Sequence, residues 1–170
     1  MNISYIINEL GEDRERYFNA IAPPIVQASN FSFKKVDDLT KAFEDEMGGY
    51  IYSRGLNPTV EILRKKLAAL DQAEDCLVLN SGAAAIFAGV LANVKAGDHI
   101  VSVREPYSWA KRMFDHILPR FGVTTSYIDG SLLENWKDAT MPNTSFYYLE
   151  SPNSWEFNLQ HIEEVAGFAK

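Results

Sequence analysis

Residues 50–59, with the sequence YIYSRGLNPT, place a phenol and a guanidinium two positions apart, just before a run with helical spacing. Tyr52 supplies the phenol, and Arg54 supplies a cation that keeps its charge at any physiological pH. A guanidinium forms paired, charge-assisted hydrogen bonds with phosphate oxygens. The turn formers that follow would suit any connecting loop, but the Tyr-Ser-Arg triplet would not be needed there. The stretch therefore predicts an anion site.

The stretch LNSGAAAI contains a second candidate anion site. An apolar run ends at Asn80, Ser81 is a favourable helix N-cap, and Gly82 and Ala83 fall in the first helical turn. Free N–H groups at such a turn attract anions. A capped, alanine-rich core helix explains the same residues, so both interpretations stay open. Neither a Walker loop nor a GxGxxG fingerprint is present, which removes the two commonest nucleotide motifs.

Two further residues follow predicted strands. Tyr107 comes just after the strand at 99–103, and Glu150 lies near the end of the strand at 145–151. Ligands of open parallel sheets bind beyond the carboxyl ends of the strands. Tyr107 either stacks on a planar ligand or begins an amphipathic helix, and Glu150 either orients a ligand group or caps a turn. The histidines lack the spacing of metal ligands, so no metal site is predicted.

Composition narrows the class of protein. The net charge is −7 and no Lys/Arg cluster exceeds a pair, which argues against nonspecific binding to nucleic acid. No apolar run approaches the roughly 20 residues that span a bilayer, so no membrane partner is expected. The single cysteine, Cys76, excludes an internal disulfide. Together these features predict a cytoplasmic protein.

The elements that must position these residues alternate along the chain. Residues 1–60 carry little strand pattern and predict an extended arm with short helices. From there on, short apolar runs alternate with helical spacing, which is typical of βαβ units around a parallel sheet. Strands are predicted at 76–80, 99–103, 123–129 and 145–151, and helices at 59–71, 81–94, 107–121 and 159–170.

Taken together, these stretches resemble the N-terminal half of the pyridoxal-phosphate (PLP) enzymes of cysteine and methionine metabolism, which include cystathionine γ-synthase, the cystathionine lyases and methionine γ-lyase. The match runs in order through APPIVQASNFSF, YSRGLNPT, LNSGAAAI, EPYSWAKRMF and YYLESPNSW. YSRxxNPT followed by SGxAAI at this distance is a specific signal.

The resemblance implies a fold and a division of the chain. The expected fold is α/β, part of the large domain of the aspartate-aminotransferase-like (fold type I) PLP-dependent transferases, with a mostly parallel sheet and flanking helices. Residues 1–60 would form an N-terminal arm that contacts a neighbouring subunit. Residues 61–170 would form the first part of the PLP-binding domain.

The resemblance also assigns a phosphate site. Ser81, Gly82 and Ala83 match the helix start that holds the cofactor phosphate. Tyr52 and Arg54 match a pair that reaches the same phosphate across a subunit interface.

Three residues match the surroundings of the cofactor ring. Tyr107 matches the tyrosine that stacks on the pyridine ring and takes part in proton transfer, which makes it the predicted catalytic residue. Glu150 matches an acidic residue with a supporting role. Family members commonly read E-[ST]-P-x-N-P here, with the asparagine near the ring hydroxyl. In this chain Ser154 stands in its place and Asn153 is displaced by one. Trp109 should narrow the substrate pocket.

The resemblance implies a lyase or transferase that acts on sulfur-containing amino acids. β-Elimination, γ-elimination and γ-replacement stay open, as do two other hypotheses: a non-catalytic oligomerisation module and an unrelated phosphate- or nucleotide-binding domain. In the family, the aspartate that pairs with the pyridine nitrogen and the lysine that carries the cofactor lie further along the chain. We therefore expect these 170 residues alone to be inactive.

The expected sheet is incomplete without strands from another polypeptide. The resemblance makes only the strands at 99–103 and 123–129 direct neighbours, which leaves edges with unpaired backbone groups. We expect completion in a homo-oligomer or by a companion chain that carries the C-terminal half.

Overall fold

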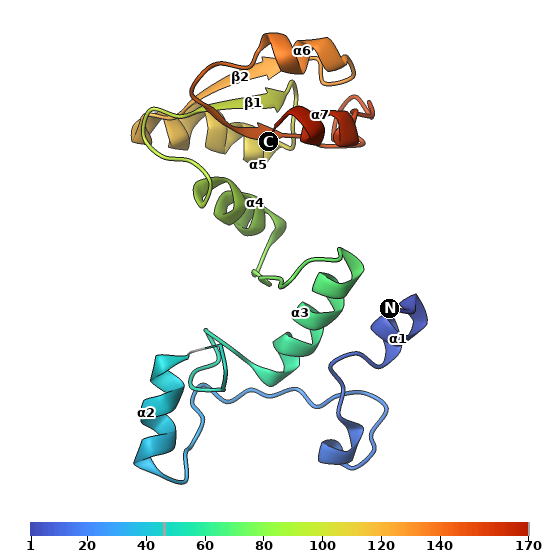
Figure 1. Ribbon diagram of the computed structural model, residues 1–170, viewed down its shortest axis with the longest axis vertical. Coiled ribbons are helices and arrows are strands. Elements are labelled where there is room, and N and C mark those ends of the chain that lie inside the picture. Colours follow the sequence, from blue (N-terminus) through green and yellow to red (C-terminus); the bar gives the residue numbers. More distant parts are fainter. Residues whose placement is uncertain (46, 170) are drawn as a thin grey trace. The chain divides into compact units, whose positions relative to one another are not determined.

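The computed structural model describes residues 1–45 and 47–169, which form two compact units (Figure 1). The division falls between Val78 and Leu79. The predicted boundary between residues 60 and 61 stays a prediction, and the helix that spans it belongs to the first unit.

In its described residues, the first unit holds four helical segments joined by long connections. Its elements are α1 (Ile3–Asn8), η1 (Arg14–Tyr17), α2 (Val36–Glu44) and α3 (Pro58–Leu70).

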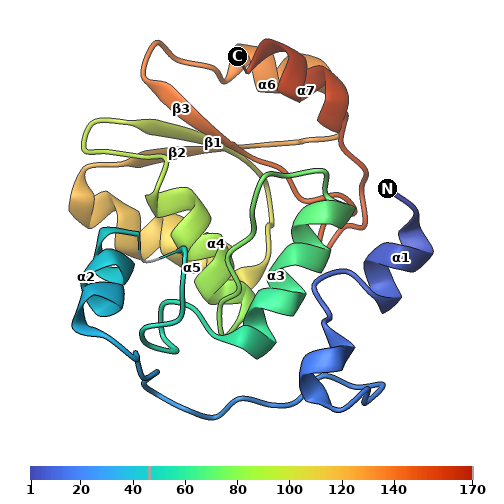
Figure 2. The same cartoon turned by 60° about the horizontal axis from the view of Figure 1, so that its bottom comes forward.

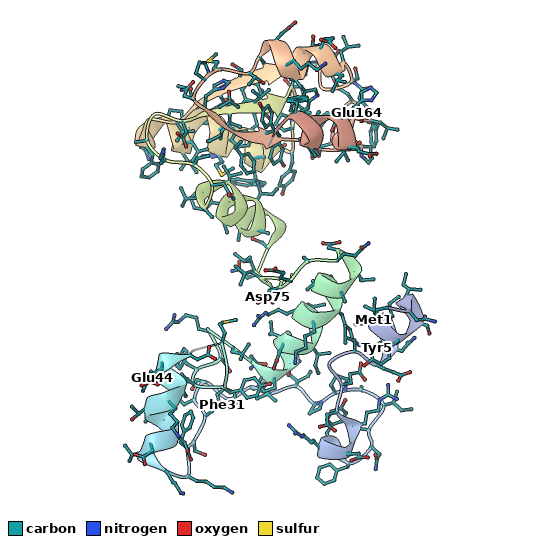
Figure 3. The ribbon with its side chains drawn as sticks, in the orientation of Figure 1. Met1, Tyr5, Phe31, Glu44, Asp75 and Glu164 are labelled. Carbon is teal, nitrogen blue, oxygen red and sulfur yellow. The ribbon has the colours of Figure 1, made fainter. Side chains whose placement is uncertain are left out.

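Local chemistry sets both ends of α3. Asn57 is its N-cap, with a side chain that accepts a hydrogen bond from the Thr59 N–H at 2.9 Å, and proline occupies the first helical position. Beyond the helix, Asp75, labelled in Figure 3, pairs with Arg64 at 2.5 Å. The same guanidinium donates to the Cys76 carbonyl at 2.9 Å. The segment after α3 is thereby held against the helix.

A partly buried ion pair fixes the N-terminal segment on α3. The Lys66 ammonium lies 2.6 Å from the Glu12 carboxylate and also donates to the Ile7 carbonyl at 2.8 Å. The hydrogen bond from Lys66, with a further contribution from Arg14, lowers the pKa of Glu12.

The second unit is a three-stranded parallel sheet between two helical layers. Its strands are β1 (His99–Val103), β2 (Thr124–Ile128) and β3 (Thr144–Tyr148), in the order β2-β1-β3. Its helical segments are α4 (Gly82–Leu91), α5 (Ser108–Arg112), η2 (Met113–Ile117), η3 (Leu118–Phe121), α6 (Leu133–Asp138) and α7 (Ile162–Phe168). Figure 2 shows α4 and α5 on one side of the strands and α6 and α7 on the other.

Alternation along β1 divides the core in two. Ile100 packs with Met113 and Phe114 beneath α4 and α5, while Val101 faces Trp136 of α6 and Val165 of α7. All five residues of β1 are buried, as expected of a central strand with helices on both faces. The predicted α/β class with a parallel sheet is confirmed.

One prediction about strands is wrong and another holds only in part. Residues 76–80 form no strand, and Leu77 is 76% exposed. A strand requires a hydrogen-bonded neighbour, and no described segment pairs with this one. The predicted strand order holds only in part: β1 and β2 are neighbours as expected, but they are not the only such pair, because β3 also pairs directly with β1, with Ile100 opposite Phe146.

Two helical segments differ from their predictions as well. The expected helix at 107–121 begins as α5 but widens to a π-helical turn and ends as a 3₁₀ turn. Pro119 explains the change, because proline has no N–H to donate within the helix and its ring clashes with the carbonyl four residues earlier. α6 was not predicted. Its N-cap is Leu132, which gives no helix-start signal.

Candidate active site

The carboxyl ends of β1 and β3 lie at the same edge of the sheet, because the two strands are parallel neighbours. The loop after β1 leads through Pro106 to Tyr107 and α5. The loop after β3 carries Glu150 and Ser154. Adjacent carboxyl ends are where open α/β sheets bind ligands.

Glu150 brings three predicted site residues together. One of its carboxylate oxygens accepts the backbone N–H of Tyr107 at 2.8 Å, and the other accepts the hydroxyl of Ser154. Its own N–H donates to the side-chain carbonyl of Gln160 at 2.9 Å. The Tyr107 side chain is half-buried against the core cluster around Ile100. Glu150 therefore ties the start of α5 to the loop after β3.

A second tyrosine lies beside this group. Tyr148 stands edge-on to Phe114, with ring centroids 5.1 Å apart. Burial, and then the nearby Glu150 and Tyr107, raise the pKa of Tyr148 to about 12. Its phenol therefore stays neutral over the physiological pH range.

Asn153 is a site residue whose role the sequence did not reveal. It is 2% exposed, and its amide donates to the carbonyls of Arg104 at 3.3 Å and Glu105 at 3.1 Å. Its side-chain oxygen accepts the N–H groups of Trp155 at 3.0 Å and Glu156 at 2.9 Å. An asparagine after a proline predicts a turn, but these distant carbonyl partners leave no local pattern.

The first turn of α4 has open hydrogen-bond donors. The Ser81 hydroxyl accepts the Ala84 N–H at 3.1 Å, as the predicted N-cap. The N–H groups of Gly82 and Ala83 have no acceptor among the described residues. A Cβ added to Gly82 would meet no atom within 4 Å. This turn offers two unused donors and the positive end of a ten-residue helix.

Tyr52 and Arg54 belong to the first unit, whereas the other predicted site residues belong to the second. The Arg54 guanidinium carbon lies 5.3 Å from the centroid of the Tyr52 ring. An antiparallel bridge between Asn30 and Tyr52 fixes the backbone there. In the described part of the chain, Arg54 makes no ion pair with a carboxylate. The pair lines a hollow of about 180 Å³.

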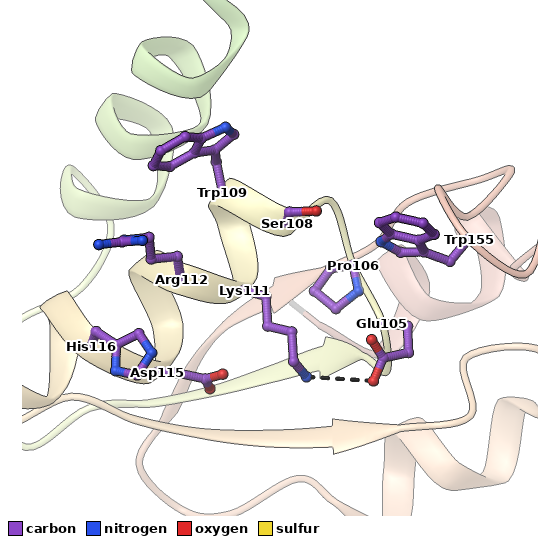
Figure 4. Close-up of a pocket in the computed structure, with 9 residues that line it drawn as sticks. All are labelled: Glu105, Pro106, Ser108, Trp109, Lys111, Arg112, Asp115, His116 and Trp155. Carbon is purple, nitrogen blue, oxygen red and sulfur yellow. Dashed lines mark ion pairs between the residues drawn. The ribbon is translucent and has the colours of Figure 1, made fainter.

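A larger groove, of about 540 Å³, runs beside α5 in the second unit. Figure 4 shows Trp109 on one wall and Trp155 on the other. The Arg112 guanidinium lies 5.6 Å from the centroid of the Trp109 ring, and Lys111 pairs with Glu105 at 3.6 Å. Trp109 is 57% exposed and occupies part of the space at this edge.

None of the described helices has the length and apolar character that crossing a bilayer requires. Nowhere in residues 1–45 and 47–169 do three His, Cys, Asp or Glu side chains gather as a metal site would require.

Comparison with known proteins gives a consistent set of matches. The profile of the family described as Cys/Met metabolism PLP-dependent enzyme matches residues 5–170. L-methionine gamma-lyase of Treponema denticola is 38% identical over 152 residues, which cover 89% of this chain and 38% of that protein. O-succinylhomoserine sulfhydrylase of Pseudomonas aeruginosa is 33% identical over 84% of this chain and 34% of that protein. The chain thus spans less than two fifths of the length of these two relatives.

Solved structures show the same fold. The crystal structure of metB from Corynebacterium glutamicum superposes with a TM-score of 0.86 at 28% identity, over 98% of this chain and 42% of that chain. A Campylobacter jejuni structure that contains N'-pyridoxyl-lysine-5'-monophosphate superposes with a TM-score of 0.89 at 24% identity, over 99% and 42%.

Proposed function

Because this chain belongs to the Cys/Met metabolism PLP-dependent enzyme family, we propose that it is the cofactor-binding part of a lyase or transferase acting on sulfur-containing amino acids. The relatives described above act on methionine or on O-succinylhomoserine according to their names. For this protein the substrate class is a methionine-, cystathionine- or homoserine-ester-type amino acid. The reaction class is β- or γ-elimination or γ-replacement.

The observation that carries the proposal is the open first turn of α4. A phosphate is an anion well suited to two free N–H groups at a helix start. Ser81 holds the turn in shape, and Gly82 and Ala83 bind the phosphate of PLP. Gly82 suits this role because its backbone is not shielded by a side chain. The residues present therefore fit the phosphate end of the cofactor.

Tyr107 has the place and the chemistry to serve the other end of the cofactor. Its aromatic ring stacks on the pyridine ring, and its phenol moves a proton to or from the substrate. Glu150 and Ser154 complete this side of the site in a supporting role. When bound, PLP supplies an electron sink for reactions at the Cα of an amino acid.

Tyr52 and Arg54 bind the same phosphate from a neighbouring subunit. In support, Arg54 is a guanidinium with no carboxylate partner in the described residues, and its fork geometry matches phosphate oxygens. Residues 1–60 then form the arm that contacts that subunit. The active protein is a cytoplasmic homo-oligomer, a dimer or tetramer, or is completed by a companion chain.

A second candidate function, association without catalysis, is favoured by apolar side chains in the first unit. Phe18, Ile21 and Ile25 are between 77% and 99% exposed. Three large apolar side chains exposed within eight positions of one segment are what a surface that associates with another protein would present. This function would use the arm but not the helix start.

The test is a titration of the complete protein with PLP, followed by absorbance and by the cofactor's induced circular dichroism. Saturable binding that ATP does not displace supports the cofactor-binding function. Stable self-association without PLP binding would favour the association module instead. Displacement of PLP by ATP would favour a nucleotide-binding domain.

The subunit crossing has its own test. An Arg54→Ala protein mixed with a Tyr107→Ala protein should regain part of the activity, because hybrid oligomers contain one intact site. Hybrids that form, as shown by mass, but stay inactive would contradict the crossing.

A further inference from the structure

The loop between β1 and Tyr107 is fixed mainly by hydrogen bonds to side chains from another part of the chain. Arg104 keeps its N–H in the sheet by donating to the Ile128 carbonyl at 2.7 Å. Pro106 has no N–H to offer. Glu105 has φ of +50°, a left-handed conformation that non-glycine residues hold only where neighbours fix it, and it precedes a proline, which disfavours helical backbone there further.

Two side chains of the loop after β3 make these hydrogen bonds. Asn153 donates to the carbonyls of Arg104 and Glu105, on either side of the strained position. Glu150 accepts the N–H of Tyr107. The groups that fix the loop after β1 thus come from residues more than 40 positions further along the chain.

Both side chains are already engaged by the protein, and the buried Asn153 has no hydrogen-bonding capacity left for a cofactor. Both carboxylate oxygens of Glu150 already accept hydrogen bonds, and Asn153 is buried with its oxygen and its amide engaged. Asn153 also organises the turn that carries Trp155, the wall of the groove opposite Trp109 (Figure 4). One asparagine thereby joins the two walls of the groove.

We propose that Glu150 and Asn153 are positioning residues that act through Tyr107: together they fix the backbone of residues 104–107 and so give the Tyr107 ring a single place at the carboxyl end of the sheet. The effect on cofactor binding rests on the proposed function. The effect on the backbone of residues 104–107 is independent of it.

The backbone role is tested without cofactor, by amide hydrogen exchange in the complete protein. Glu150→Ala should speed exchange of the Tyr107 amide by about 10- to 100-fold, the usual effect of losing a hydrogen bond to a charged acceptor. Glu150→Gln keeps an acceptor oxygen and should restore most of the protection. A role based on charge alone would predict that Gln fails as Ala does. Tyr107 exchange that is unchanged in Glu150→Ala would overturn the proposal.

Asn153→Asp tests the hydrogen bonds from Asn153 to the carbonyls of residues 104 and 105 with almost no change in side-chain size. The carboxylate still accepts from Trp155 and Glu156 but turns an anionic oxygen toward the two carbonyls of residues 104 and 105. We expect faster exchange at Tyr107 and a weaker induced circular dichroism of bound PLP. Asn158→Ser is the matched control, because the Asn158 side chain makes its one hydrogen bond among the described residues to the Glu156 carboxylate. Equal effects of the two substitutions would count against Asn153.

A double-mutant cycle on PLP affinity tests whether Glu150 acts through Tyr107. Glu150→Ala should weaken PLP binding in the natural protein but add little in a Tyr107→Ala background, since the element it positions is then gone. Additive losses would mean that Glu150 contacts the cofactor itself. If the natural protein binds no PLP, the proposed function fails, while the exchange measurements still decide the positioning role.

Discussion

At the scale of single residues, the backbone and the side chain of Tyr107 have separate partners. The N–H is fixed by Glu150, while the ring packs against the core and the phenol makes no hydrogen bond to a described residue. Substitution of the phenol alone is therefore structurally mild.

Tyr107→Phe should keep most of the PLP affinity and slow turnover, because the ring face remains while the proton-carrying hydroxyl is lost. Steady-state kinetics and PLP titration of the complete protein measure the two effects separately. Tyr147→Phe is the control, since it removes a phenol whose hydroxyl partner, Thr140 at 2.9 Å, lies beside α6 on the other face of the sheet. Equal turnover in Tyr107→Phe and the natural protein would exclude the proton-transfer role.

Arg54→Ala should weaken PLP binding by about 10- to 100-fold, because a charge-assisted hydrogen bond contributes about 1.5–3 kcal/mol. The fold should be unaffected, since Arg54 contacts mainly the Tyr52 ring. Arg120→Ala, which removes an exposed arginine in η3, should leave the affinity unchanged. An unchanged affinity in Arg54→Ala would show that Arg54 does not bind the phosphate.

The residues that the sequence identified at this scale carry their chemistry in local patterns. The Ser81 cap and the open Gly82 follow from neighbours within one helical turn, and the structure has both. In the sequence, Asn153 stands out only as a displaced family residue. Its carbonyl partners lie 48 and 49 positions away, and nothing in the surrounding sequence encodes that contact.

At the scale of elements, helix starts were more predictable than strand partners. The caps of α3 and α4 depend on two or three adjacent residues. The run at 76–80 has strand composition but no described partner, and pairing is a property of the tertiary fold. α6 was missed because its stability comes from Trp136, which is fully buried between β1 and α7.

Ser81→Ala should lower the free energy of unfolding by about 0.5–2 kcal/mol, because the Ala84 N–H loses its capping acceptor. Urea unfolding followed by circular dichroism measures the change. Ser108→Ala is the matched control: Ser108 begins α5, is exposed, and makes no side-chain hydrogen bond to a described residue. Equal stability of the two variants would argue against the cap.

At the scale of the sheet, one histidine joins all three strands. His99 of β1 is 1% exposed, with Nδ1 at 2.8 Å from the Thr144 hydroxyl of β3 and Nε2 at 2.9 Å from the Ser126 hydroxyl of β2. Burial lowers the pKa of His99. A neutral ring has one donor and one acceptor, which two hydroxyls can match.

The second unit should therefore lose stability in mild acid. Below about pH 6.5, His99 binds a proton in the unfolded chain but stays neutral while it is buried in the folded protein. The free energy of unfolding therefore falls as the pH drops toward the folded pKa. Urea titrations between pH 5 and 7.5 measure the slope. His99→Asn should flatten it, whereas His116→Gln, at an exposed position, should not. A slope that persists in His99→Asn would assign it to other groups.

The order β2-β1-β3 has a consequence for synthesis on the ribosome. The central strand, the most completely buried of the three, is made first, and its two neighbours emerge later on either flank. At about 5–20 residues per second, some 45 residues separate β1 from the end of β3, a delay of roughly 2–9 s. Until β3 has been made, the nascent HIVSV segment lacks one of the two strands that flank it in the folded sheet. The polypeptide should therefore depend on chaperones most strongly while this middle section is being translated.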